Sequence, residues 1–168
     1  MVNNSSLMRA KTMARPRTFD ESTVLTAVAE AFWTQGYEAT STRDLVNRTG
    51  LNQPSLYNAF GDKRSLYRRA LVHYLECSVR DRIRRLEALP NAGMAITGFF
   101  AEVLNRTLND PFHRGCLLVN SALEANAEDT DLRQAVAEEF ESIRSFFEGR
   151  LQTFRMQSVD SVEIDVKQ

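Results

Sequence analysis

The chain has 168 residues, of which 43% are apolar and 26% are charged, and this composition is sufficient for a hydrophobic core in one or two small domains. No apolar run approaches the ~18 consecutive residues of a membrane-spanning helix, and the N-terminus lacks the pattern of a secretory signal peptide. These features argue against a membrane protein, and we expect a cytoplasmic one.

Charge is divided unevenly along the chain. Residues 1–70 contain ten Lys and Arg against six Asp and Glu, a net charge of +4, whereas residues 71–168 contain eleven against sixteen, a net charge of −5. A basic first part joined to an acidic second part is typical of a nucleic-acid-binding domain followed by a different domain. An ordinary fluctuation of charge is the alternative explanation.

Residues 1–18 contain four basic residues and no acidic one, and they show no apolar periodicity. We expect this segment to be a disordered basic arm in isolation. Arg15 and Arg17, next to the folded part, are its candidates for contact with DNA phosphates or the minor groove. For Arg9 and Lys11 a solvated tail is the better interpretation.

A first helix is predicted over about 20–35. Val24, Val28 and Phe32 recur at helical spacing and give it one apolar face. Gly36 follows at the position where glycine commonly ends a helix. We interpret this helix as support for the DNA-reading helices, without DNA contacts of its own.

Residues 40–63 predict two short helices joined by a tight turn. Ser41 can cap the first helix, with Asp44 three residues later as in a capping box. Gly50 stands where that helix must stop, and Asn52 can cap the second helix. The pattern is that of a helix-turn-helix.

The outer face of the second helix is small and polar, as a helix that enters the major groove of DNA requires. Gln and Asn can pair with adenine, and Pro can contact a thymine methyl group. The base-edge candidates are Gln53, Pro54, Ser55 and Asn58.

The order of residues in this region resembles the TetR/AcrR family of transcriptional regulators. The resemblance covers roughly residues 15–75. It is carried by Gly36-Tyr37, Thr40-Ser41, Leu45, Gly50-Leu51, Ser55-Leu56-Tyr57, Phe60, Lys63 and Leu66-Tyr67.

The resemblance implies an all-α fold, with an N-terminal three-helix, homeodomain-like helix-turn-helix domain and a helical C-terminal domain for ligand binding and dimerisation. It also implies that Tyr57 contacts a backbone phosphate. We further expect phosphate contacts from Lys63, at the free N–H groups of the next helix start, and from Thr42 and Arg43 on the flank.

The rest of the chain also reads as helical. A connecting helix is predicted over about 62–88, after a helix-turn-helix domain over 19–65. Further helices are predicted over 93–109 and 130–155, and residues 116–125 form a short apolar segment that we expect to be fully buried.

The second domain of the resembling family holds an effector pocket for a small molecule. Here the apolar residues have a plainer alternative as ordinary core. The candidate pocket residues are Phe99, Phe100, Val103, Leu117, Phe140, Ile143 and Phe147.

The histidines and cysteines predict no metal site and no cofactor. Cys116 at a helix start is a candidate redox or metal sensor, although cysteine is often simply buried. His73 and His113 stand alone, and the nearness of His113 to Cys116 is the one hint of a metal. Cys77 is interpreted as a reduced thiol. No nucleophile–base pair or metal constellation is present in the sequence, so we expect no enzyme activity.

The apolar spacing changes after residue 156. Residues 157–168 alternate through Val162, Ile164 and Val166, which suggests a short strand or, without a partner strand, a disordered tail. The resembling family continues with two more long helices, so we expect a truncated helical domain over 89–156. This expectation makes the homodimer of the family doubtful for this chain.

The sequence therefore predicts a DNA-binding transcriptional regulator that acts on a palindromic double-stranded operator. By the resemblance it is a repressor released by a small-molecule effector, which moves the connecting helix. The alternative is a DNA-binding-impaired interaction module that pairs with other regulators.

Overall fold

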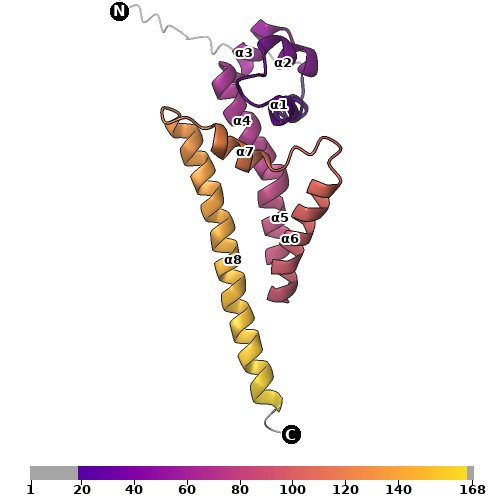
Figure 1. Cartoon of the computed structure of the whole chain (residues 1–168), viewed down its shortest axis with the longest axis vertical. Helices are drawn as coiled ribbons and strands as arrows, with labels where there is room; N and C mark the ends of the chain where they lie inside the picture. Colours follow the sequence, from indigo (N-terminus) through magenta and orange to yellow (C-terminus); the bar gives the residue numbers. More distant parts are fainter. Residues whose placement is uncertain (1–18, 166–168) are drawn as a thin grey trace, which may run out of the picture.

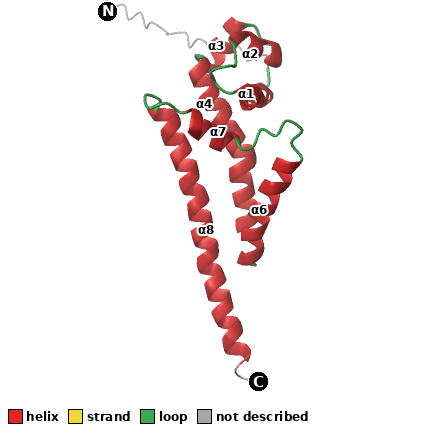
Figure 2. Ribbon diagram, in the orientation of Figure 1, coloured by secondary structure: helices red, strands yellow, loops and turns green. Residues whose placement is uncertain are grey.

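The computed structural model describes residues 19–165, with their side chains up to residue 157. This part of the chain consists of helices and connecting loops, without strands (Figures 1 and 2). The elements are α1 (Glu21–Gln35), α2 (Thr42–Thr49), α3 (Gln53–Phe60), α4 (Lys63–Leu75), the π-helical segment η1 (Glu76–Arg80), α5 (Asp81–Glu87), α6 (Ala92–Leu108), α7 (Leu117–Glu124) and α8 (Thr130–Asp165). The all-α prediction is confirmed.

The N-terminal head consists of α1, α2 and α3 packed against the first turns of α4. The Asp20 carboxylate starts α1 by accepting a hydrogen bond from the Thr23 N–H at 2.9 Å. The core of the head consists of fully buried side chains such as Phe32, Leu45 and Leu56. Burial of this apolar surface is the main force that holds the short helices α2 and α3 in place.

A single long helical rod connects the head to the rest of the molecule. It is formed by α4, η1 and α5, and the residues at both junctions, Leu75 and Arg80, keep right-handed helical backbone angles. The prediction of one helix over about 62–88 therefore matches the structure, except for the π-helical segment. A π segment within an α-helix is rare and is often found at functional sites.

The second part of the molecule is built on α6, α7 and α8. Helix α6 packs against both α5 and α8, whereas α7 packs against α8 and α4. The head lies at one end of the molecule, and α8 extends away from it toward the other end (Figure 1). Phe99 and Phe146 are buried where α6 meets α8, with their ring centroids 5.6 Å apart.

Two sequence predictions need correction here. Helix α8 continues to Asp165, where a strand or a disordered tail was expected after residue 156. Met156, Val159 and Val162 are three residues apart, which is also compatible with one face of a helix. In addition, extending an existing helix is far easier than starting a new one. Residues 166–168 lie outside the described part.

The expectation that residues 116–125 are fully buried is also wrong. Leu117 and Leu118 are buried, but Leu123 is 83% exposed and Val119 is exposed as well. An eight-residue helix can turn only one stripe toward the core. The remaining side chains of α7 must therefore face outward, however apolar the segment is.

Candidate nucleic-acid interface

The turn between α2 and α3 is built as the sequence predicts. The N–H of Ser41 donates to Asp44 Oδ2 at 2.9 Å, while the Ser41 hydroxyl accepts from the Asp44 N–H at 3.2 Å, which completes a capping box. Gly50 ends α2 at a φ of 68°, in the left-handed region that favours glycine. The Asn52 side chain then starts α3 by accepting from the Ser55 N–H at 2.9 Å.

The four base-edge candidates differ in how accessible they are. Gln53, Pro54 and Asn58 are exposed, whereas Ser55 is half-buried. On the opposite side of α3, Leu56 is fully buried. Helix α3 therefore holds its apolar side in the core and leaves amide groups facing solvent, as groove reading requires.

Tyr57 and Thr42 form a hydrogen bond that the sequence does not predict. The Tyr57 hydroxyl lies 2.7 Å from Thr42 Oγ1, and both side chains are half-buried. This hydrogen bond joins the first turn of α2 to α3. Arg43, beside Thr42, is exposed. The two hydroxyl groups thus lie together at the edge of the α2–α3 unit, where a phosphate oxygen could join them.

Lys63 contacts two residues of the loop that follows α1. Its ammonium group is 3.4 Å from the Glu38 carbonyl oxygen and 4.5 Å from the centre of the Tyr37 ring. The start of α4 is already capped by Asp62, which accepts from the Ser65 N–H at 2.7 Å. The Asp62 carboxylate therefore already satisfies one backbone N–H of this helix start, and a phosphate site formed by the remaining N–H groups stays a prediction.

The charge of Asp62 is stabilised by the same contact. Hydrogen bonds from the Ser65 backbone and side chain lower the pKa of Asp62 below its ordinary value. The carboxylate is therefore negative at neutral pH. Phosphate contact by Lys63 stays a prediction, as do those of Arg15 and Arg17, which lie outside the described residues.

Contacts between the second part of the molecule and the head are the main feature that the sequence did not predict. The Tyr37 N–H donates to Glu124 Oε2 at 3.0 Å, at the end of α7. The Tyr67 hydroxyl lies 2.8 Å from Ser121 Oγ, and this hydrogen bond is buried. These contacts attach α7 to two parts of the head, because Tyr37 follows α1 and Tyr67 belongs to α4.

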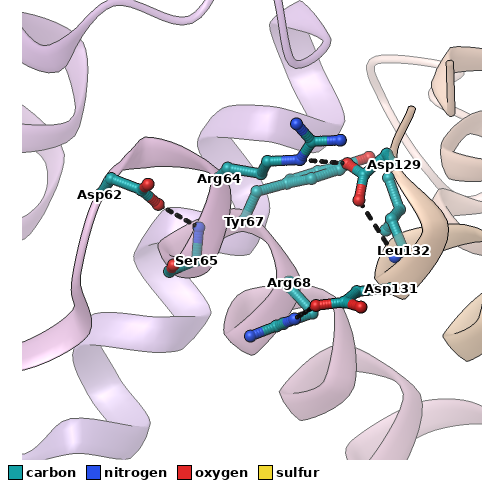
Figure 3. A pocket seen from close by; sticks show the side chains of 8 residues that line it. All are labelled: Asp62, Arg64, Ser65, Tyr67, Arg68, Asp129, Asp131 and Leu132. Carbon is teal, nitrogen blue, oxygen red and sulfur yellow. Dashed lines mark hydrogen bonds and ion pairs between the residues drawn. The ribbon is translucent and has the colours of Figure 1, made fainter.

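Two ion pairs continue this interface along α4. Arg64 Nε lies 2.8 Å from Asp129 Oδ2, and Arg68 pairs with Asp131. Figure 3 shows these side chains around a small cavity between the start of α4 and the start of α8. Each exposed pair contributes little free energy by itself. Together with the two hydrogen bonds of α7, they fix where the second part meets the connecting rod.

Comparison with known proteins agrees with this architecture. Residues 24–70 match the family of bacterial regulatory proteins, tetR family, and residues 94–168 match the tetracycline-repressor-like C-terminal domain. An uncharacterised helix-turn-helix transcriptional regulator of Bacillus subtilis (strain 168), YezE, is 32% identical over 156 residues, which span 92% of this chain and 80% of that protein. The chain belongs to the TetR family. It is a transcriptional regulator of the helix-turn-helix class.

Other transcriptional regulators are similar over most of the chain. The transcriptional repressor ComR of Escherichia coli (strain K12) is 28% identical over 158 residues, or 94% of this chain and 73% of that protein. The solved structure of a cysteine mutant of the TetR-family regulator CifR, complexed with 26bp double-strand operator DNA, is 39% identical. It superposes with a TM-score of 0.71 and covers 83% of this chain and 73% of that one.

Some of the aromatic residues proposed for a TetR-type effector pocket lie close together. Phe147 lies 5.0 Å from Phe99 and 5.3 Å from Phe100, measured between ring centroids. Phe146, which is not among the candidates from the sequence, belongs to the same cluster and is buried. Phe146 is three residues after Ile143 on α8, and this helical spacing predicts that the two side chains share a face.

The other pocket candidates separate into buried and exposed groups. Leu117 is buried, and Val103 and Ile143 pack against the core. Phe100 and Phe140 are exposed, which places them on the surface of the described chain and not around an enclosed space. A pocket role for these residues remains a prediction.

Cys116 lies at the N-terminal end of α7 and is half-buried. Its Sγ is 4.0 Å from the Tyr74 hydroxyl. Within the described residues, no group of three or more His, Cys, Asp and Glu side chains is arranged to hold a metal ion. No described helix is both long and apolar enough to cross a membrane.

Proposed function

We propose that this TetR-family regulator is a repressor that binds a palindromic double-stranded operator through the outer face of α3. The observation that carries the proposal is the exposure of Gln53, Pro54 and Asn58 on a helix whose other side is locked in the core. The operator complex of CifR, a relative 39% identical to this chain, supports it. Since regulators of this family act on the bacterial chromosome, we place this function in the cytoplasm and assign no enzyme activity.

In this proposal, the phosphate contacts come from Thr42, Arg43, Tyr57 and Lys63, with Arg15 and Arg17 of the N-terminal arm. Such contacts set the register of the protein on the duplex without reading sequence. The base contacts then come from α3 alone. A dimer would present two such helices to two half-sites with matching symmetry.

The release mechanism follows from the way the second part of the molecule holds the head. An effector bound within α6, α7 and α8 would act on Tyr37 through Glu124 and on Tyr67 through Ser121. Because those contacts reach both α1's end and α4, a displacement of α7 would turn the head. We therefore assign transmission to α7 together with α4, where the sequence pointed to the connecting helix alone. The domain division at about residues 65 and 89 is part of the same proposal.

Base-contact and phosphate-contact variants should weaken DNA binding in different ways. Gln53→Ala and Asn58→Ala are each expected to cost about 1–3 kcal/mol on the preferred operator and to change which sequences are preferred. Lys63→Ala and Tyr57→Phe are expected to weaken binding to all sequences alike. Lys63→Ala should also reduce the slope of log affinity against log salt concentration by about 1.

The measurement is fluorescence anisotropy with the DNA upstream of the gene and with base-substituted duplexes, combined with a mass measurement in solution. Gln152→Ala and Arg133→Ala, both at exposed positions on α8, are the matched controls and should bind like the unchanged protein. If the α3 variants bound every duplex as the unchanged protein does, the reading face would have to lie elsewhere.

A further inference from the structure

A pocket of about 170 Å³ lies where the head meets the second part of the molecule, and it shares no lining residue with the cavity at the Arg64 and Arg68 ion pairs. Its walls come from α1, from α4 with η1, and from α6. The residues that matter for its chemistry are Glu30, Trp33, His73, Tyr74, Cys77 and Arg106. A cavity of roughly 150 Å³ accepts a benzene molecule, so a single ring with one substituent is a matching size.

Arg106 gives this pocket a positive charge without a carboxylate partner. Its guanidinium lies 5.0 Å from the centroids of both the Trp33 and the Tyr74 rings. Among the described residues no acidic side chain forms a salt bridge with it, whereas Arg114 pairs with Asp110 and Arg82 with Glu102 nearby. A half-buried guanidinium offers a planar set of donors that matches a carboxylate.

The other polar groups of the pocket are already engaged or lie at its edge. His73 Nε2 lies 2.9 Å from Thr26 Oγ1 and 3.9 Å from Cys77 Sγ. The Ser78 hydroxyl donates to the Tyr74 carbonyl oxygen at 2.8 Å. Glu30 is exposed and would repel a second negative group, so an acidic ligand has to direct its charge toward Arg106.

The apolar lining suits the body of such a ligand. Ala29 is buried beside the pocket, and the Trp33 and Tyr74 rings meet edge to face at 5.3 Å. Cys77 and Ser78 belong to the π-helical segment η1, a kind of irregularity that is frequent at binding sites. Size, charge and lining thus agree on one class of molecule.

We propose that this pocket binds a small monocyclic organic acid, with its carboxylate on Arg106 and its ring against Trp33, Tyr74 and Ala29. The site is distinct from the phenylalanine cluster between α6 and α8. Because its walls belong to α1 on one side and α6 on the other, the ligand fixes the head against the second part of the molecule. Ligand binding to this pocket is measured without DNA, so the test is independent of operator binding.

Trp33 is the single tryptophan of the chain and reports directly on the pocket. Sodium benzoate is expected to change its fluorescence in a saturable way at concentrations up to roughly 10 mM, tenfold above a millimolar dissociation constant. Benzyl alcohol, which has the same ring but no charge, should bind at least about tenfold more weakly. Equal affinity for the two probes, or no saturable response to benzoate, would overturn the proposal.

Variants test the assigned residue. Arg106→Met removes the charge but keeps an unbranched side chain, and it should weaken benzoate binding about tenfold or more. Arg133→Met, at an exposed position on α8, should leave the binding unchanged. Glu30→Gln should tighten binding, because it removes the repelling charge. Isothermal titration calorimetry gives a second measure of affinity that does not depend on the tryptophan environment.

Circular dichroism establishes that each variant is folded. If Arg106→Met does not fold, the comparison of benzoate with benzyl alcohol on the unchanged protein still decides the question. Unaltered benzoate affinity in a folded Arg106→Met variant is the result that would refute the assignment.

Discussion

Leu56→Ala is expected to lower the free energy of unfolding by about 2–5 kcal/mol and to abolish operator binding. Leu56 is fully buried on the inner side of α3, where it joins this helix to the core of the head. Removing its methyl groups leaves a cavity and loses contacts that an eight-residue helix cannot replace by its own stability. Urea unfolding followed by circular dichroism measures the first effect, and anisotropy with operator DNA measures the second.

Leu123→Ala is the matched control for this variant. Leu123 is 83% exposed on α7, so the same chemical change should alter the free energy of unfolding by less than about 0.5 kcal/mol. A Leu56→Ala protein as stable as the Leu123→Ala protein would contradict the packing of α3. Normal operator affinity in a destabilised but folded Leu56→Ala protein would show that α3 does not need this anchor to read DNA.

Raising the pH from about 10 to about 12 is expected to lower the free energy of unfolding by about 2 kcal/mol through Tyr67 alone. Burial raises the pKa of Tyr67 from 10.0 to about 12, although its hydrogen bond with Ser121 acts in the opposite direction. In this pH range the unfolded chain releases the phenolic proton while the folded protein retains it. The stabilisation is therefore complete below pH 10 and is lost as the pH rises through the folded value.

Urea unfolding at a series of pH values measures this loss, and Tyr67→Phe identifies its source. The variant lacks the titrating group and should show a smaller decrease between pH 10 and 12. Some decrease will remain, because burial also raises the pKa of Tyr74 and of Tyr37. An identical alkaline profile for the variant and the unchanged protein would mean that Tyr67 is not buried against α7.

The local features of the head follow from short-range sequence patterns. The Ser41–Asp44 capping box, the glycine stop at Gly50 and the Asn52 cap each involve residues within three or four positions of one another. Their hydrogen bonds depend on side-chain type and spacing, which the sequence contains directly. The exposed amides of α3 follow in the same way, because helical periodicity decides which side chains share a face.

Other features of the head depend on residues far away in the sequence. The bond between Tyr57 and Thr42 joins two helices, and the position of Lys63 depends on the Tyr37 ring and the Glu38 carbonyl. Asp62 could have been recognised as the cap of α4, since Ser65 follows at capping distance. That signal predicts a carboxylate at the helix start.

The sequence by itself determined the helical class, the reading helices with their caps, and the resemblance to TetR regulators, because all of these depend on contacts local to the chain or on a dense linear motif. Tertiary structure alone decided that α7 is fastened to Tyr37 and Tyr67, that α8 continues through residues whose alternation suggested a strand, and that Arg106 lies against two aromatic rings without an acid. The α7 contacts and the position of Arg106 depend on long-range packing and on which charges meet in space, and no linear spacing encodes either. The end of α8 combines two competing local patterns, and the helix that precedes it favours the helical one.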